Sequence, residues 1–174
     1  MLTKLDKLKP FFEDNYAEIH VRAYAQLMKI SPPTASSILK KFVEDGILVS
    51  RTDKRYDLYK AKREEEIFVR LQQVYWYNKL IYSGTLSKLQ TMYFNHPIIL
   101  FGSISKAEAT ADSDIDVAII GSTTKNYDFS DFEKKLKRKI QVMAFKTIND
   151  IPSNLKNPIL NGYMLVRGAF YGLE

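Results

Sequence analysis

The stretch FGSISKAEATADSDID, residues 101–116, lies between two apolar runs and decides how the second half of the chain is interpreted. The run PIILF ends just before Gly102-Ser103, and ten residues separate Ser103 from Asp114, which stands two places before Asp116 and the run VAII. Both runs are short, apolar and rich in β-branched residues, so they predict two buried strands. In an antiparallel or mixed pair, the end of the first strand lies near the start of the second. We therefore expect Gly102-Ser103 to converge with the two aspartates.

The residue types in this stretch suit a phosphate and a metal ion. Asp114 and Asp116 are two apart on a predicted strand, so their side chains share one face with Cα atoms about 6–7 Å apart. Hard carboxylate oxygens are the ligands that Mg²⁺ prefers. Gly102 lets the backbone approach a phosphate closely, and Ser103 offers a hydroxyl and an amide N–H. The pattern predicts a phosphate cradle facing a metal site, with a plain surface loop before an aspartate pair as the alternative.

The residues that follow complete a small mixed α/β sheet, which we assign to residues 96–174. The segment DFSDFEKKLKRK (128–139) predicts a helix, and IQVMAF (140–145) predicts a third strand. The tail NPILNGYMLVRGAFYGLE (157–174) is interpreted as a helix that covers the sheet. Its apolar residues are Ile159, Leu160, Met164, Leu165 and Phe170.

Composition limits the class of protein. The chain has 174 residues, enough for one domain or two small ones, with 45% hydrophobic and 26% charged residues. No apolar run approaches the roughly 18 residues of a membrane span, so no membrane partner is expected. The absence of cysteine excludes disulfides and thiolate metal sites and favours a cytoplasmic location. The net charge of +6 is compatible with a polyanionic partner.

Residues 1–61 predict three helices followed by a β-hairpin. The helices correspond to LDKLKPFFEDN (5–15), EIHVRAYAQLMKI (18–30) and TASSILKKFVEDG (34–46), and the hairpin to ILVSRT (47–52) and RYDLYKA (55–61). Ser31 is a suitable N-cap for the third helix, and Gly46 is suited to end it. The apolar residues of that helix form one stripe, so its opposite face is polar and basic.

This order of elements resembles a winged helix-turn-helix domain, and the resemblance implies binding to double-stranded DNA. The candidate contact residues are Thr34, Ser36, Ser37, Lys40 and Lys41 on the third helix and Arg51, Lys54 and Arg55 on the hairpin. Serine and threonine specify bases poorly, so most of the affinity is expected from phosphate contacts. The alternative is a small helical domain with a solvated basic face.

Residues 62–95 form a helical connector between the two halves. The spacing of the apolar residues predicts a long helix to about residue 82 and a shorter one to about residue 94, interrupted by Gly84. The aromatic cluster Tyr75, Trp76 and Tyr77 is more typical of a core or a dimer interface than of base stacking. We therefore expect a homodimer.

The pattern of Gly102, Ser103, Asp114 and Asp116 resembles the nucleotidyltransferase motif of the DNA polymerase β superfamily, in the spacing of its minimal members. The whole layout resembles archaeal winged-helix proteins fused to such a domain, so the expected fold class is α+β. The resemblance implies that Asp114 and Asp116 are catalytic and bind Mg²⁺. It implies that Gly102, Ser103 and Lys106 bind a nucleoside triphosphate. The reaction would transfer a nucleotide to an acceptor hydroxyl, and a protein side chain is one acceptor, as in antitoxins of the superfamily.

One position departs from the superfamily pattern. Its third carboxylate normally comes from the next strand, where this chain has Gln141, and an amide cannot act as a general base. Losing such a base typically slows a reaction about 10²–10⁴-fold. Asp128 and Asp131 are candidate substitutes, and Ala107 stands where minimal members often have glycine. Two functions stay open: a nucleotidyltransferase that binds DNA, or a transcriptional regulator whose nucleotidyltransferase domain is catalytically weak or inactive.

Overall fold

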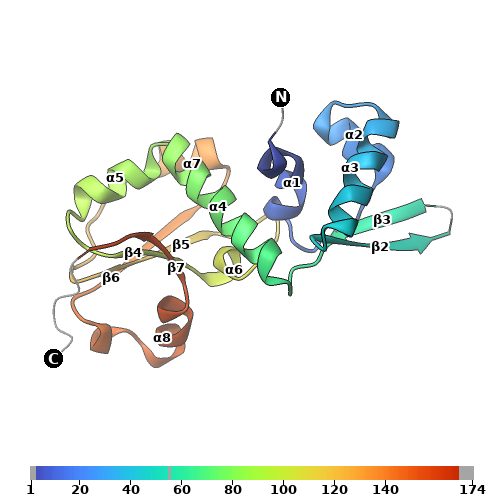
Figure 1. Cartoon of the computed structure of the whole chain (residues 1–174). Helices are drawn as coiled ribbons and strands as arrows, with labels where there is room; N and C mark the ends of the chain where they lie inside the picture. Colours follow the sequence, from blue (N-terminus) through green and yellow to red (C-terminus); the bar gives the residue numbers. More distant parts are fainter. Residues whose placement is uncertain (1–2, 55, 169–174) are drawn as a thin grey trace. The chain divides into compact units, whose positions relative to one another are not determined.

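The computed structural model describes residues 3–54 and 56–168 and divides the chain into two compact units (Figure 1). The first unit is Met1–Gln72 together with Ala107–Ala111, and the second is Gln73–Lys106 together with Asp112–Glu174. None of the described helices combines the length and apolar character that crossing a membrane requires.

The described residues of the first unit form three complete helices, the first part of α4 (Glu66–Tyr82) and a three-stranded antiparallel sheet. Its elements are α1 (Lys4–Glu13), β1 (Ile19–His20), α2 (Val21–Met28), α3 (Pro32–Glu44), β2 (Leu48–Asp53) and β3 (Tyr56–Ala61). The sheet order is β1-β3-β2, with β2 and β3 forming the hairpin. The predicted order of three helices and a hairpin is confirmed. The predicted second helix is wrong at its start, because Ile19 and His20 pair with β3 and the His20 side chain caps α2 by accepting from the Ala23 amide.

The ends of α3 follow from its sequence. The Ser31 side chain accepts a hydrogen bond from the Thr34 amide, and Pro32 opens the first turn, where its missing N–H is not needed. Gly46 follows the helix with φ +71°, a left-handed conformation that glycine adopts without strain. Ala35, Leu39 and Phe42 are buried on the inner face, which leaves the polar face exposed as predicted.

The second unit is built on a four-stranded mixed sheet in the order β6-β5-β4-β7. Its strands are β4 (Ile98–Phe101), β5 (Ile115–Ile120), β6 (Ile140–Phe145) and β7 (Tyr163–Val166), with β4 antiparallel to β5 and β7, and β5 parallel to β6. Its helical elements are α5 (Thr85–Met92), α6 (Gly102–Ser105), α7 (Ser130–Leu136), a 3₁₀ turn (Ile148–Asp150) and α8 (Ser153–Leu160). The helix α4 (Glu66–Tyr82) precedes α5, and Gly84, at φ +83°, separates the two as predicted.

Both faces of this sheet are covered. In Figure 1, α5 and α7 lie on one side of the sheet and α8 lies on the other. Every residue of β4 is buried, and the core on the α8 side is formed by Ile99, Phe101, Ala118, Ile120, Ile151 and Ile159. Burial on both faces explains why β4 and β5 appear in the sequence as continuous apolar runs rather than alternating ones.

The predicted C-terminal helix is wrong. Helix α8 ends at Leu160, and residues 163–166 form β7, which pairs with the edge of β4; Phe170 lies outside the described residues. Gly162 lets the chain approach β4 closely enough for β7 to pair with it. A Cβ at this position would lie 2.6 Å from the Ile99 side chain and 2.7 Å from the Leu100 carbonyl oxygen. Strand pairing with β4 therefore overrides the helical spacing of Met164 and Leu165.

Candidate nucleotide and metal site

The pairing of β4 with β5 brings Gly102 against Asp116. Phe101 is the register partner of Asp116, and Gly102 follows it at φ +75°. A Cβ at position 102 would lie 2.3 Å from Asp116 Oδ2, closer than any real contact. Glycine is therefore required at this position for two reasons: the backbone conformation is left-handed, and the Asp116 carboxylate occupies the space of a side chain. The predicted convergence of Gly102 and Asp116 is present in the structure.

The two carboxylates are electrostatically unfavourable in the absence of a cation. Asp116 is half-buried, and this burial raises the pKa of its carboxyl above the ordinary value, with the nearby charge of Asp114 raising it further. Both causes penalise the charged form. A divalent cation between the carboxylates would reverse both effects, so the donor set fits Mg²⁺.

Gln141 occupies the position at which the resemblance to the superfamily implies a third carboxylate. It is the register partner of Asp116 on the parallel strand β6, and its Nε2 donates a hydrogen bond to Asp114 Oδ2 at 2.6 Å. The amide therefore satisfies one acceptor of Asp114 without adding negative charge. It provides no group that could accept a proton from an attacking hydroxyl.

Asp128 and Asp131 do not replace the missing acid. They flank the start of α7, which follows the far end of β5, whereas Asp114 and Asp116 lie at its beginning. The Asp128 side chain accepts from the Ser130 amide at 2.9 Å, which lowers its pKa, and Asp131 forms an ion pair with Lys134 at 3.3 Å. Within residues 3–54 and 56–168, no group of three acidic or histidine side chains is placed to hold a metal.

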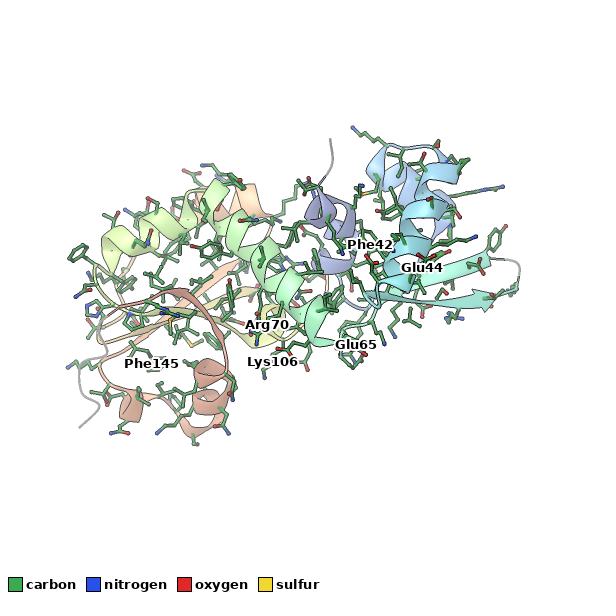
Figure 2. All side chains as sticks on the ribbon, viewed as in Figure 1. Phe42, Glu44, Glu65, Arg70, Lys106 and Phe145 are labelled. Atoms are coloured by element: carbon green, nitrogen blue, oxygen red, sulfur yellow. The ribbon has the colours of Figure 1, made fainter. Side chains whose placement is uncertain are left out.

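The short helix α6 carries the remaining predicted nucleotide ligands. Ser103 lies in its first turn and is partly exposed, and Lys106 follows its end with an exposed side chain, labelled in Figure 2. Ala107 is fully buried and left-handed, with φ +58°. Glycine would adopt that conformation freely, whereas for alanine it costs roughly 1–2 kcal/mol. The chain therefore has alanine at this position at the cost of a strained backbone conformation.

Most of the predicted DNA-contact residues lie on the exposed surface of the first unit. Thr34, Ser37, Lys40, Lys41, Arg51 and Lys54 are exposed, Ser36 is partly buried, and Arg55 lies outside the described residues. These side chains come from the outer face of α3 and from the β2–β3 hairpin, as the sequence predicted.

Acidic neighbours neutralise part of this surface, which the sequence did not reveal. Arg51 donates to both carboxylate oxygens of Glu18, at 2.5 and 3.2 Å, and this pairing raises the pKa of Arg51 and lowers that of Glu18. Lys41 forms ion pairs with Asp45 at 3.1 Å and with Glu44 at 3.4 Å; Glu44 is labelled on α3 in Figure 2. Glu18 and Arg51 are brought together only by the β1–β3–β2 sheet.

Comparison with known protein families gives a match for the second half of the chain. Residues 88–167 match the family described as polymerase beta, nucleotidyltransferase. The matched segment contains all four strands of the second sheet, with Gly102, Ser103, Asp114, Asp116 and Gln141. Neither the search of curated proteins nor the search of solved structures gave a match. The family match supports a nucleotidyltransferase-like domain, and therefore a nucleotidyltransferase-like function, for this part of the chain.

The electrostatic penalty at Asp116 predicts a stability change. The variant Asp116→Asn should melt at a higher temperature than the wild type at pH 7 in EDTA, because the amide has no charge to desolvate and does not repel Asp114. Since the folded chain raises the pKa of Asp116, the free energy of unfolding falls as the pH rises from the unfolded pKa through the folded one. The difference from the wild type should therefore vanish well below pH 3.8.

Thermal melts followed by circular dichroism measure this effect. Asp112→Asn is the matched control, since Asp112 is exposed and precedes the same strand. A lower melting temperature for Asp116→Asn at pH 7 in EDTA would contradict the electrostatic interpretation.

Proposed function

We propose that the nucleotidyltransferase-like domain binds a nucleoside triphosphate together with Mg²⁺. The observation that carries the proposal is the placement of Asp116 against Gly102, beside Asp114, inside the matched family segment. Asp114 and Asp116 would hold the ion, which when bound supplies the positive charge that a triphosphate needs to approach two carboxylates. Ser103 would contribute its amide and hydroxyl, and Lys106 its ammonium group, to the phosphates.

The chemistry that suits this site is nucleotide transfer. An acceptor hydroxyl oxygen would bond to the α-phosphorus, the bond from that phosphorus to the β-phosphate oxygen would break, and pyrophosphate would leave. The hydroxyl proton would pass to solvent, because Gln141 accepts none. This predicts slow transfer, with a protein side chain among the candidate acceptors. A regulator with a weak or inactive domain is the second candidate, and the neutral Gln141 bound to Asp114 is the observation that favours it.

We further propose that the first unit is a winged helix that binds duplex DNA, with α3 in the major groove and the β2–β3 hairpin as the wing. The order of its elements and the exposed Lys40, Lys41 and Lys54 support this. A homodimer is part of the proposal, because α4 exposes Ile67, Val74 and Ile81 at intervals of seven residues along one line of the helix. A second copy of the chain would cover that line and present two DNA half-sites.

Nucleotide binding tests the first proposal. Calorimetric titration of the wild type with ATP should show binding that depends on Mg²⁺, and Asp116→Asn should weaken it about tenfold or more, because one anionic metal ligand is removed. Binding without Mg²⁺ should stay weak or improve slightly in the variant, because one repelling charge is absent. Asp112→Asn should bind like the wild type, and equal Mg²⁺-dependent affinity for Asp116→Asn would show that the site is misassigned.

The role of Gln141 is tested by restoring an acid. Gln141→Glu should release pyrophosphate from Mg²⁺-ATP faster than the wild type, by up to about 10²–10⁴-fold, the usual contribution of a general base. Transfer to water or to an added acceptor is followed with α-labelled ATP. Gln90→Glu makes the same change at an exposed position of α5 and should have no effect. Rapid transfer by the wild type would refute this account of Gln141.

Binding to duplex DNA tests the role of the first unit. Replacing Lys40, Lys41, Arg51 and Arg55 by alanine should weaken binding and flatten its salt dependence by a slope of about 0.9 for each phosphate that is no longer neutralised. Glu18→Gln should act in the opposite sense, because it removes the nearer of the two carboxylates that pair with Arg51 and leaves only Asp53, at 3.7 Å. Light scattering of the complex should give two chains per duplex. An unchanged salt slope in the quadruple variant would exclude this surface.

A further inference from the structure

Asn15 binds the segment Ala107–Ala111, which lies in the sequence between Ser103 and Asp114 and belongs to the same unit as Asn15. It follows α1 and is completely buried. Its backbone N–H donates to the Ala109 carbonyl oxygen at 2.8 Å, and its side-chain Oδ1 accepts from the Ala109 N–H at 2.7 Å. One residue therefore satisfies both backbone polar groups of Ala109, as a neighbouring strand would.

The side-chain nitrogen of Asn15 is also hydrogen-bonded. Its Nδ2 donates to the Phe11 carbonyl oxygen at 2.8 Å and to Gln72 Oε1 at 2.5 Å, and Gln72 Nε2 donates back to Asn15 Oδ1 at 3.3 Å. Gln72 is also completely buried. The amide is thus fixed in one orientation, with its oxygen directed at Ala109, because a flipped amide would oppose donor to donor.

Ala109 lies in the loop that joins Ser103 to Asp114. The chain leaves the second unit after Lys106, packs with the first unit through Ala107–Ala111, and returns to the second unit at Asp112. Ala107 and Ala109, both within this segment, are completely buried. On its return, the segment is held by Arg138, whose Nη1 donates to the Ser113 carbonyl oxygen next to Asp114.

We infer that Asn15 is a positioning residue for the nucleotide site, because it fixes the middle of the loop that carries Ser103 near one end and Asp114 at the other. The inference rests on the proposed Mg²⁺-nucleotide binding. Asn15 does not contact the carboxylates; it acts by fixing Ala109, midway between Ser103 and Asp114. Without that anchor, the segment between Ser103 and Asp114 loses a restraint on its conformation, although the pairing of β4 with β5 still holds the two strands in register.

The full-length variant Asn15→Ala tests this inference by two readouts. Calorimetry should show Mg²⁺-ATP affinity reduced about fivefold or more, the lower end of usual coupling between sites. Hydrogen exchange in the ligand-free protein should rise at Ala109 and extend through Ser113 to Asp116, while protection in α3 stays as in the wild type. Tyr24→Phe is the matched control: it removes another buried hydrogen bond of the first unit, from Tyr24 to the Lys7 carbonyl oxygen, and should change nucleotide affinity less than about twofold.

A conservative variant keeps the test decisive if Asn15→Ala does not fold. Asn15→Ser adds no charge, and its hydroxyl is too short to reach the Ala109 N–H as Asn15 Oδ1 does, so its Mg²⁺-ATP affinity should fall in the same direction as that of Asn15→Ala. Wild-type affinity in a folded Asn15→Ser, or unchanged exchange from Ser113 to Asp116 in a folded Asn15→Ala, would overturn the inference. If the wild type binds no Mg²⁺-ATP, the proposed function fails, and exchange at these residues still decides whether Asn15 positions the segment.

Discussion

The antiparallel pairing of β4 with β5 is the constraint on which the candidate site depends. This register places Gly102, the first residue after β4, directly against the side chain of Asp116, the second residue of β5. A slip of one residue would turn Asp116 to the opposite face of the sheet. Such a slip of β5 would also remove Ala118 and Ile120 from the core against α8, where they pack with Ile99 and Phe101 of β4.

The same sheet determines what Gln141 can do. Because β6 runs parallel to β5 in register, any side chain at position 141 is delivered beside Asp116 and within reach of Asp114. A carboxylate at position 141 would bring three negative charges together. Three carboxylates repel one another more than two, so they would need a cation more strongly. The amide instead donates to Asp114 and lowers the repulsion. Glutamine at this position therefore adds a hydrogen-bond donor and no negative charge, where a glutamate would add a charge and a proton acceptor.

Local signals in the sequence predicted much of the fold and site. The strands around residues 101–116 and the ends of α3 were readable, because continuous apolar runs, a serine N-cap and a C-terminal glycine act over a few residues. Strands β1 and β7 were missed because each is short and exists only through pairing with a distant strand. The ion pair of Glu18 with Arg51 was missed for the same reason, since 33 residues separate the partners.

Asn15 shows how a residue that positions a site can lack any motif. In the sequence it resembles an ordinary residue after a helix, and its partner Ala109 is 94 positions away with a side chain that carries no polar group. The interaction uses the backbone of Ala109, so residue identity at that position carries no information about it. The span from Ser103 to Asp114 is long for a connection between paired strands. Such a loop needs hydrogen bonds beyond those of the paired strands to hold one conformation, and the two bonds between Asn15 and Ala109 are of this kind.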